Sequence, residues 1–258
     1  MICAIIGIIA ILADAYLYYR AKFMATESIV HVEGYSLVAD KAELLHQNHP
    51  ERLLLLGDSR IFRLPLPVKF GIDFGNVSIV NKGFGGGVKR ASEAFVSEGV
   101  ALKPVFVFVQ TGINDVINDA PEIAVPRFQQ FTKDFPAVVR KQGAEPILST
   151  IIPVCRRQLF RHWKFLLYYP PHHRNWNQTV QIINTWLREY AATNGIRLVD
   201  LDLAFRNNSG RLREECFDGD GIHLSTEGNR LLWEQLATKI HSRAAVNKLP
   251  DVAGKAKK

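Results

Sequence analysis

Residues 52–59 read RLLLLGDS, so that four consecutive leucines run directly into a Gly-Asp-Ser sequence. An apolar run of this length, with little alternation of polar and apolar residues and a turn signal at its end, is typical of a strand buried on both faces. Such strands occur in parallel sheets that helices cover on both sides. Because ligands bind outside the carboxyl ends of the strands in these sheets, Ser59 is at a position where a functional residue is expected.

The rest of the chain repeats this pattern. Four further runs of strand length, each rich in Val, Ile and Leu, lie at 77–80, 105–109, 146–152 and 196–201. Segments with helical spacing of their apolar residues alternate with these runs, at 88–101, 122–142, 176–193 and 226–244. Strands and helices in alternation predict an α/β fold built on a parallel sheet of five strands.

Length and composition are those of one globular domain. The chain has 258 residues, of which 47% are hydrophobic and 22% charged, and we expect a single domain with a sizeable core over residues 25–246. The formal net charge of +7 favours an anionic partner. Part of this excess lies in residues 247–258, which we expect to be a basic, flexible tail. Outside 156–176 no basic stretch is interleaved with aromatic residues, so we do not expect nucleic-acid binding.

The amino-terminal segment, residues 1–24, is strongly apolar. Residues 2–13 are all apolar or glycine, and the apolar character resumes after Asp14. The stretch has about the 20 residues that a membrane-spanning helix needs. We favour a single membrane anchor, while a cleaved signal segment and a buried helix stay open. No Lys or Arg precedes the run, which argues against a signal peptide, whereas Arg20 and Lys22 after it would hold the domain in the cytoplasm. The side of the membrane, or export, therefore stays open.

The cysteines and histidines form no pattern typical of a metal site. The three cysteines, Cys3, Cys155 and Cys216, contain no C-x-x-C pair, so we expect neither a disulfide framework nor a structural zinc. A bridge between Cys155 and Cys216 stays open, with buried free thiols favoured. His172 and His173 are adjacent without a third ligand in the sequence, and no metal is predicted there.

Side chains that can carry chemistry stand at the predicted strand ends. Asp220 and His223 are three residues apart, a spacing at which one turn of chain brings the carboxylate to the imidazole Nδ1–H and leaves Nε2 as a base. Ser59 could give its proton to that base and attack an acyl carbon. Two sources of N–H donors for the resulting oxyanion follow neighbouring strands, the glycine run 83–87 and the side-chain amide of Asn114.

Four short motifs in this order resemble the blocks of the SGNH (GDSL-like) hydrolase superfamily. They are Gly57-Asp58-Ser59, Asn81-x-Gly83-x-x-Gly86, Gly112-x-Asn114-Asp115 and Asp220-x-x-His223. The resemblance extends from about residue 52 to the last helix and implies a three-layer α/β/α, flavodoxin-like fold with a central parallel five-stranded sheet. It implies no metal or organic cofactor.

The resemblance also implies a role for each matching residue. Ser59 would be the nucleophile, His223 the base and Asp220 the carboxylate that orients it. The oxyanion hole would consist of the main-chain N–H groups of Ser59 and Gly86 and the side chain of Asn114.

One residue departs from the family's pattern. Arg60 stands where many members have Leu or another apolar residue. An arginine beside the nucleophile predicts recognition of a carboxylate, sulfate or phosphate near the ester, and we include Arg60 as a substrate-binding candidate. Pairing with an acidic side chain on a helix is the alternative, which stays open.

Residues 156–176 are unusual in composition, since they mix Arg and His with many aromatic residues and a Pro-Pro pair. Their place after the fourth predicted strand puts them at the edge where the candidate residues gather. A lid, a sugar-stacking wall and a membrane-contacting surface are each compatible with this composition, and so is a buried helix with a basic outer face.

These observations favour a serine ester hydrolase that works through an acyl-serine intermediate. By resemblance, its substrate would be an acyl or acetyl ester of a carbohydrate or lipid. An O-acyltransferase with the same triad is the alternative, because transfer differs from hydrolysis only in which hydroxyl attacks the acyl-serine. A membrane-tethered binding or scaffold protein that has lost turnover is the alternative of another class.

Overall fold

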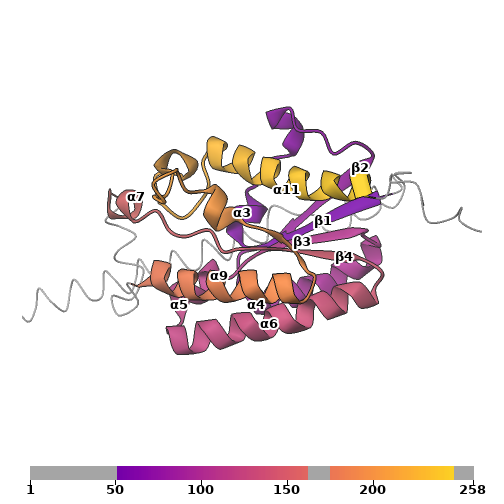
Figure 1. The fold of residues 1–258 in the computed structure, drawn as a ribbon, viewed down its shortest axis with the longest axis horizontal. Coiled ribbons are helices and arrows are strands. Elements are labelled where there is room, and N and C mark those ends of the chain that lie inside the picture. The colour runs from indigo at the N-terminus through magenta and orange to yellow at the C-terminus, as the bar shows by residue number, and fades with distance from the viewer. Residues whose placement is uncertain (1–50, 162–174, 247–258) are drawn as a thin grey trace, which may run out of the picture.

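The computed structural model describes residues 51–161 and 175–246, and its centre is a sheet of five parallel strands (Figure 1). The strand order is β2-β1-β3-β4-β5, the flavodoxin-like order of doubly wound sheets. This confirms the predicted parallel sheet. The strands are β1 (Glu51–Gly57), β2 (Val77–Gly83), β3 (Phe106–Gln110), β4 (Glu145–Ser149) and β5 (Arg197–Val199).

Helices cover both faces of the sheet, which makes three layers (Figure 1). One face is covered by α4 (Val88–Ala94), α5 (Ile113–Asn118), α6 (Pro121–Lys141) and α9 (Trp176–Thr193). The other face is covered by α3 (Ser59–Phe62), α10 (Leu201–Ala204) and α11 (Thr226–Val246). The short helix α7 (Arg156–Arg161) follows β4, and its Arg157 pairs with Glu214.

The four leucines of β1 account for this layering. All four are fully buried, and Leu54 and Leu56 pack with α4, α5, α6 and α9 in one core, whereas Leu53 and Leu55 pack with α3, α10 and α11 in the other. Successive side chains of a strand point to opposite faces. A run without polar residues therefore fits a strand between two apolar layers, as the sequence predicts.

Three predicted elements are shorter than expected. The strand expected over 196–201 is β5 (Arg197–Val199), and α10 begins at Leu201. The helix expected over 88–101 ends as α4 at Ala94 and continues as a π-helical turn and a 3-10 turn (Phe95–Gly99 and Val100–Leu102). Gly99 permits close packing there, since a Cβ on it would lie 2.8 Å from Leu54 Cδ2.

The strand expected over 146–152 stops at Ser149. The Thr150 N–H still donates to the Val199 carbonyl of β5, and beyond it the chain bonds to side chains of α9. Asn184 bonds both the N–H and the carbonyl of Ile151, and Asn177 does the same for Val154. These two amides take the place of a neighbouring strand for the buried segment after β4.

Several predictions fall on residues that the structure does not describe. These are the amino-terminal segment 1–24, most of the aromatic stretch 156–176 and the basic tail 247–258. In the parts of the chain that are described, no helix has the length and apolar character to span a bilayer. Cys155 and Cys216 are both buried and both free, so the open question of a bridge between them is answered in favour of thiols.

Candidate active site

Ser59 lies at the carboxyl end of β1, in a tight turn into α3. Gly57 is the last residue of β1, and a Cβ at this position would lie 2.3 Å from the carbonyl oxygen of Gln110 on β3, so a larger residue would push the strands apart. Asp58 then caps α3, with its Oδ1 accepting the Arg60 N–H at 2.9 Å. Ser59 is therefore the first residue of the helix and not its cap, and its hydroxyl is half-buried.

Asp220 and His223 lie on one short loop that its own backbone closes. An isolated antiparallel bridge joins Phe217 to Leu224, and Gly221 has a φ of +69°, which favours glycine at this turn. Asp220 Oδ1 accepts the N–H groups of Ile222 and His223, each at 2.8 Å. Its Oδ2 lies 2.5 Å from His223 Nδ1. The carboxylate thus holds the loop with one oxygen and the imidazole with the other.

The structure brings Ser59 and His223 together although 164 positions separate them in the chain. Ser59 Oγ lies 2.9 Å from His223 Nε2. With Nδ1–H donated to the carboxylate, Nε2 has the lone pair that accepts the serine proton. The three side chains therefore form the continuous hydrogen-bonded arrangement that nucleophilic serine chemistry requires.

The electrostatics of this loop keep Asp220 ionised. Burial by itself would raise the pKa of the Asp220 carboxyl, but the hydrogen bond and charge of His223, together with the two backbone N–H groups, outweigh it and hold the pKa well below its usual range. A carboxylate that stays charged can stabilise the imidazolium that forms when His223 takes a proton.

The candidate oxyanion donors also lie next to one another. Asn114, in the first turn of α5, donates through Nδ2 to the carbonyl of Gly86 at 3.0 Å. A primary amide has two N–H groups, so the second remains for another acceptor. Within residues 51–161 and 175–246, the main-chain N–H groups of Ser59 and Gly86 make no bond to a backbone carbonyl. The neighbouring loops are joined directly, since Phe84 N–H donates to the Gly57 carbonyl at 2.8 Å.

Two polar residues of the four sequence motifs hold the nucleophile turn and the glycine loop in place. The spacing of residues along the sequence does not reveal this role. Asn81, in β2, donates to the Ile61 carbonyl at 2.7 Å and accepts the Gly83 N–H, so it ties β2 to the helix that begins at Ser59. Asp115 Oδ2 accepts the Val88 N–H at 3.0 Å, so it caps α4, which follows the glycine run.

Arg60 is not placed to bind a substrate, and that expectation is corrected here. Its side chain is 1% exposed, and its guanidinium donates to main-chain carbonyls inside the protein. The alternative, a pair with an acid on a helix, is not found among the described residues either, since the bonds of the Arg60 guanidinium go to main-chain carbonyls. A buried donor whose bonds are made internally has no surface left for a ligand.

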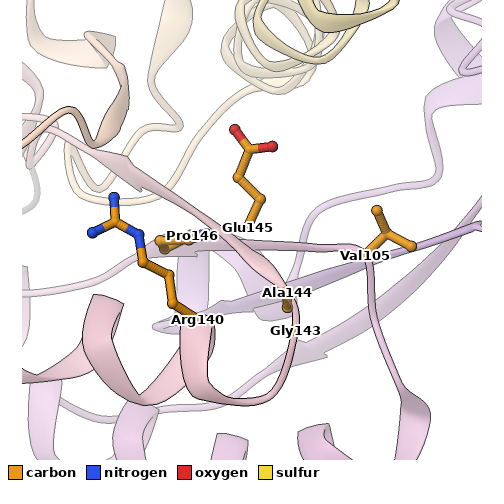
Figure 2. Close-up of a pocket in the computed structure, with 6 residues that line it drawn as sticks. All are labelled: Val105, Arg140, Gly143, Ala144, Glu145 and Pro146. Carbon is orange, nitrogen blue, oxygen red and sulfur yellow. The ribbon is translucent and has the colours of Figure 1, made fainter. Parts of the chain in front are cut away.

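Other features of the described residues lie away from this site. No group of three or more His, Cys, Asp or Glu side chains is arranged to hold a metal ion in residues 51–161 and 175–246, and His172 and His173 lie outside them. A hollow of about 270 Å³ lies at the amino-terminal ends of β3 and β4, whereas Ser59 lies at the carboxyl end of β1. Figure 2 shows the residues around this hollow. They are Val105, Arg140, Gly143, Ala144, Glu145 and Pro146.

Comparison with known families gives a match over most of the domain. Residues 63–231 match the model of the GDSL-like Lipase/Acylhydrolase family. This range contains Gly86, Asn114, Asp220 and His223 but begins just after Ser59. The assignment of Ser59 therefore depends on its contact with His223 and on the Gly-Asp-Ser motif.

Two curated proteins of Bacillus subtilis strain 168 are similar in sequence. The uncharacterized lipoprotein YqeF is 24% identical over 178 residues, which are 62% of this chain and 72% of YqeF. YesY, described as a probable rhamnogalacturonan acetylesterase, is 30% identical over 148 residues, which are 52% of this chain and 60% of YesY.

Solved structures of esterases share the fold. A GDSL-like lipase from Bacteroides thetaiotaomicron superposes with a TM-score of 0.60 at 17% identity, covering 81% of this chain and 98% of the lipase. Axe2, an acetylxylan esterase from Geobacillus stearothermophilus, superposes with a TM-score of 0.53 at 18% identity, covering 74% of this chain and 94% of the esterase. The three-layer α/β/α arrangement predicted from the sequence is therefore confirmed.

Proposed function

Because this chain belongs to the GDSL-like lipase/acylhydrolase family, we propose that it is a serine ester hydrolase with Ser59 as its nucleophile. The observation that carries the proposal is the continuous contact from carboxylate to hydroxyl. Asp220 Oδ2 lies 2.5 Å from His223 Nδ1, and His223 Nε2 lies 2.9 Å from Ser59 Oγ. A histidine in an unrelated role would not be expected to have a carboxylate at one ring nitrogen and a serine hydroxyl at the other.

The proposed reaction has two steps through an acyl-serine. His223 Nε2 takes the proton of Ser59 as Oγ bonds to the acyl carbon, and the imidazolium then gives that proton to the alcohol oxygen as the ester C–O bond breaks. In the second step a water molecule loses a proton to His223 and attacks the acyl carbon. The proton returns to Ser59 Oγ as the acid leaves. Asp220 stays ionised throughout and stabilises the imidazolium.

We assign the oxyanion hole to the N–H groups of Ser59 and Gly86 and to Asn114. The bond between Asn114 Nδ2 and the Gly86 carbonyl supports this assignment, because it fixes the amide beside the glycine loop and leaves one N–H for the developing charge. A donor of this kind is worth about 3 to 4 kcal/mol of barrier height.

The substrate we propose is an acyl or acetyl ester of a carbohydrate or lipid. Its support is the names of similar proteins, since YesY is described as a probable rhamnogalacturonan acetylesterase and Axe2 as an acetylxylan esterase. Short acyl esters should therefore be tested first. The O-acyltransferase alternative predicts product formation from an added sugar hydroxyl under the same conditions.

We further propose that residues 1–24 anchor or export the domain formed by residues 25–246. The proposal rests on the apolar run of residues 2–13 and on the similarity to YqeF, which is described as a lipoprotein. Residues 247–258 are proposed to be a basic tail. Fractionation of expressing cells into membrane and soluble parts, with protease treatment of intact cells, tests the anchor and the side on which the domain lies.

The first experiment measures turnover and covalent labelling of the full chain. Wild type, Ser59→Ala and the control Ser97→Ala, an exposed serine on the helical segment after β2, are incubated with p-nitrophenyl acetate and longer acyl esters. A fluorophosphonate probe followed by peptide mass spectrometry identifies the modified residue. We expect labelling at Ser59 and turnover in wild type and Ser97→Ala, and neither in Ser59→Ala. A folded wild type that is neither labelled nor active would favour the scaffold alternative.

A further inference from the structure

The Arg60 side chain joins the nucleophile segment to two other loops. Its Nε donates to the Ile222 carbonyl at 2.8 Å, its Nη1 to the Ile152 carbonyl at 2.6 Å, and its Nη2 lies 3.5 Å from the Pro153 carbonyl. Ile222 stands between Asp220 and His223 on the loop that carries both, whereas Ile152 and Pro153 belong to the segment after β4. One buried guanidinium therefore contacts the two segments that surround the nucleophile turn.

These contacts are adjacent to the contact between serine and histidine. Ser59 bonds to His223 and Arg60 bonds to Ile222, so two consecutive residues of one segment are joined to two consecutive residues of the other. These two bonds restrict both the separation and the relative rotation of the two segments, because neither segment can move away from the other unless both bonds break. The Arg60 contact can thus fix the distance between Ser59 Oγ and His223 Nε2.

A third contact completes the connection between the loops. The Cys155 N–H donates to the Gly221 carbonyl at 2.8 Å, so the segment after β4 and the loop of Asp220 and His223 also bond to each other directly. Arg60 lies between these two segments and donates to both. Its side chain is 1% exposed, so the bonds are protected from competition with water.

The charge of Arg60 is tolerated at this position because carboxylates are nearby. Burial lowers the pKa of the Arg60 guanidinium below its usual value, and the negative charges of Asp58 and Asp220 oppose only part of this shift. The charge therefore also favours the ionised form of the carboxylate that orients His223. A lysine would keep this charge but could not reproduce a planar set of donors that reaches carbonyls on two segments.

We propose that Arg60 is a positioning residue, which holds the loop of Asp220 and His223 against the nucleophile turn. The inference rests on the proposed function, since positioning has a meaning only if Ser59 and His223 react. Arg60 does not touch substrate in this assignment. It acts on the chemical step through the geometry of the pair beside it.

The test compares Arg60→Met and Arg60→Lys with wild type. Methionine has a similar length but no hydrogen-bond donor, so the three carbonyls lose the bonds that Arg60 gives them. Lysine keeps the positive charge but has a single donor group. Arg63→Met is the matched control, because Arg63 lies three residues on at the end of α3 and is exposed. Phe135→Leu, in the core between α6 and the sheet, controls for loss of stability alone.

We expect Arg60→Met to lower both kcat for p-nitrophenyl acetate and the second-order rate of fluorophosphonate labelling by about 10- to 100-fold, with little change in KM, since misplacement of reacting groups on the order of 1 Å has effects of this size. Arg60→Lys should lie between Arg60→Met and wild type. Circular dichroism measures the folded fraction of each variant, and the rates are compared at a temperature where all variants are folded. Per folded molecule, both controls should be labelled at the wild-type rate.

Three outcomes would count against the inference, and they can be told apart. Wild-type rates in folded Arg60→Met would overturn the positioning role and leave the esterase function intact. A wild type that is itself unlabelled and inactive would overturn the proposed function and the inference with it. If neither Arg60 variant folds, Arg60 is required for folding and the positioning role is rejected.

Discussion

Asp115 Oδ2 accepts the main-chain N–H of Val88 at 3.0 Å, and this bond joins the two loops that supply the candidate oxyanion donors. Asp115 follows Asn114 on α5, and Val88 is the first residue of α4, directly after the glycine run. A Cβ on Gly87 would lie 2.5 Å from the Asp115 carboxylate, so only glycine leaves room for the bond. The carboxyl of Asp115 is buried, and burial raises its pKa above the usual value, although the Val88 N–H and Arg127 oppose part of the rise.

The first prediction concerns this bond. Asp115→Ala should lower the free energy of unfolding by about 1 to 2 kcal/mol, as loss of a helix cap does, and should also lower kcat because the glycine loop is less firmly held. Asp115→Asn keeps an acceptor oxygen for Val88 and should recover part of both losses. Urea unfolding and ester hydrolysis measure the two effects. Asp134→Ala, an exposed acid on α6, is the control that should change neither; equal losses in Asp115→Asn and Asp115→Ala would contradict the capping role.

The second prediction concerns the oxyanion. Asn114→Ala should lower kcat for acetyl esters by about 10²- to 10³-fold with KM nearly constant, because the donor acts on charge that develops in the transition state. The lost bond to the Gly86 carbonyl should cost only about 1 kcal/mol of stability. Steady-state kinetics with thermal unfolding separate the two quantities. A kcat close to that of wild type would exclude Asn114 from the oxyanion hole.

The third prediction concerns Gly83, at the end of β2, which lies against the helix that begins at Ser59. A Cβ at Gly83 would lie 2.2 Å from the main-chain nitrogen of Phe62, in the last turn of α3. Backbone cannot move aside as a flexible side chain can, so Gly83→Ala should lower stability by about 1 to 3 kcal/mol. Because α3 begins at Ser59, labelling of Ser59 should also slow in the protein that remains folded. If Gly83→Ala has the stability and the labelling rate of wild type, the prediction is wrong, because β2 and α3 can then move apart without loss of stability.

The fourth prediction concerns Asp58 and pH. Burial raises the pKa of its carboxyl to about 6, against the charge and main-chain N–H of Arg60, which lower it. The folded state therefore keeps this proton to a higher pH than the unfolded state does. The contribution of Asp58 to stability is fully present below about pH 4 and is lost as the pH rises through about 6.

Asp58→Asn removes the charge and keeps the oxygen that caps α3. Its stability relative to wild type should therefore increase as the pH rises from 4 to 7, by roughly 3 kcal/mol for a shift of about two units. Denaturant unfolding of both proteins across this range measures the difference. A difference that stays constant with pH would mean that the carboxyl titrates at its ordinary value.

The fifth prediction concerns Asp220, whose contribution to stability changes with pH in the direction opposite to that of Asp58. Its pKa is held below the usual range mainly by His223 and the loop N–H groups, in spite of burial. Its stabilising contribution should be present above about pH 4 and should decrease as the pH falls. Asp220→Asn should therefore lose stability relative to wild type at pH 7 and less at pH 3, and its kcat should decrease by about 10⁴-fold, as when a triad carboxylate loses its charge. Full activity in this variant would rule out the assigned role.

The predictions that succeeded from sequence depend on short-range patterns. The leucines of β1 indicated burial on both faces because neighbouring side chains of a strand alternate between the two faces, whatever the rest of the chain does. The spacing of Asp220 and His223 likewise indicated their contact, because a single turn of chain brings them together.

Short-range patterns did not predict the partners of Arg60. Its neighbours in the sequence favoured either substrate recognition or an ion pair, whereas its partners are the carbonyls of Ile222 and Ile152, 162 and 92 positions away. The amides Asn177 and Asn184 bond the segment after β4 from a later helix in the same way. No local pattern specifies which distant carbonyl a buried donor will meet.

The sequence by itself determined the parallel sheet, its two apolar layers and the contact of Asp220 with His223, because these follow from the order of side chains along the chain. The tertiary structure decided that Ser59 lies 2.9 Å from His223 and that the Arg60 side chain is enclosed between the loop of Asp220 and His223 and the segment after β4. Such distances depend on how the strands and helices pack against one another. A contact between residues 164 positions apart depends on that packing.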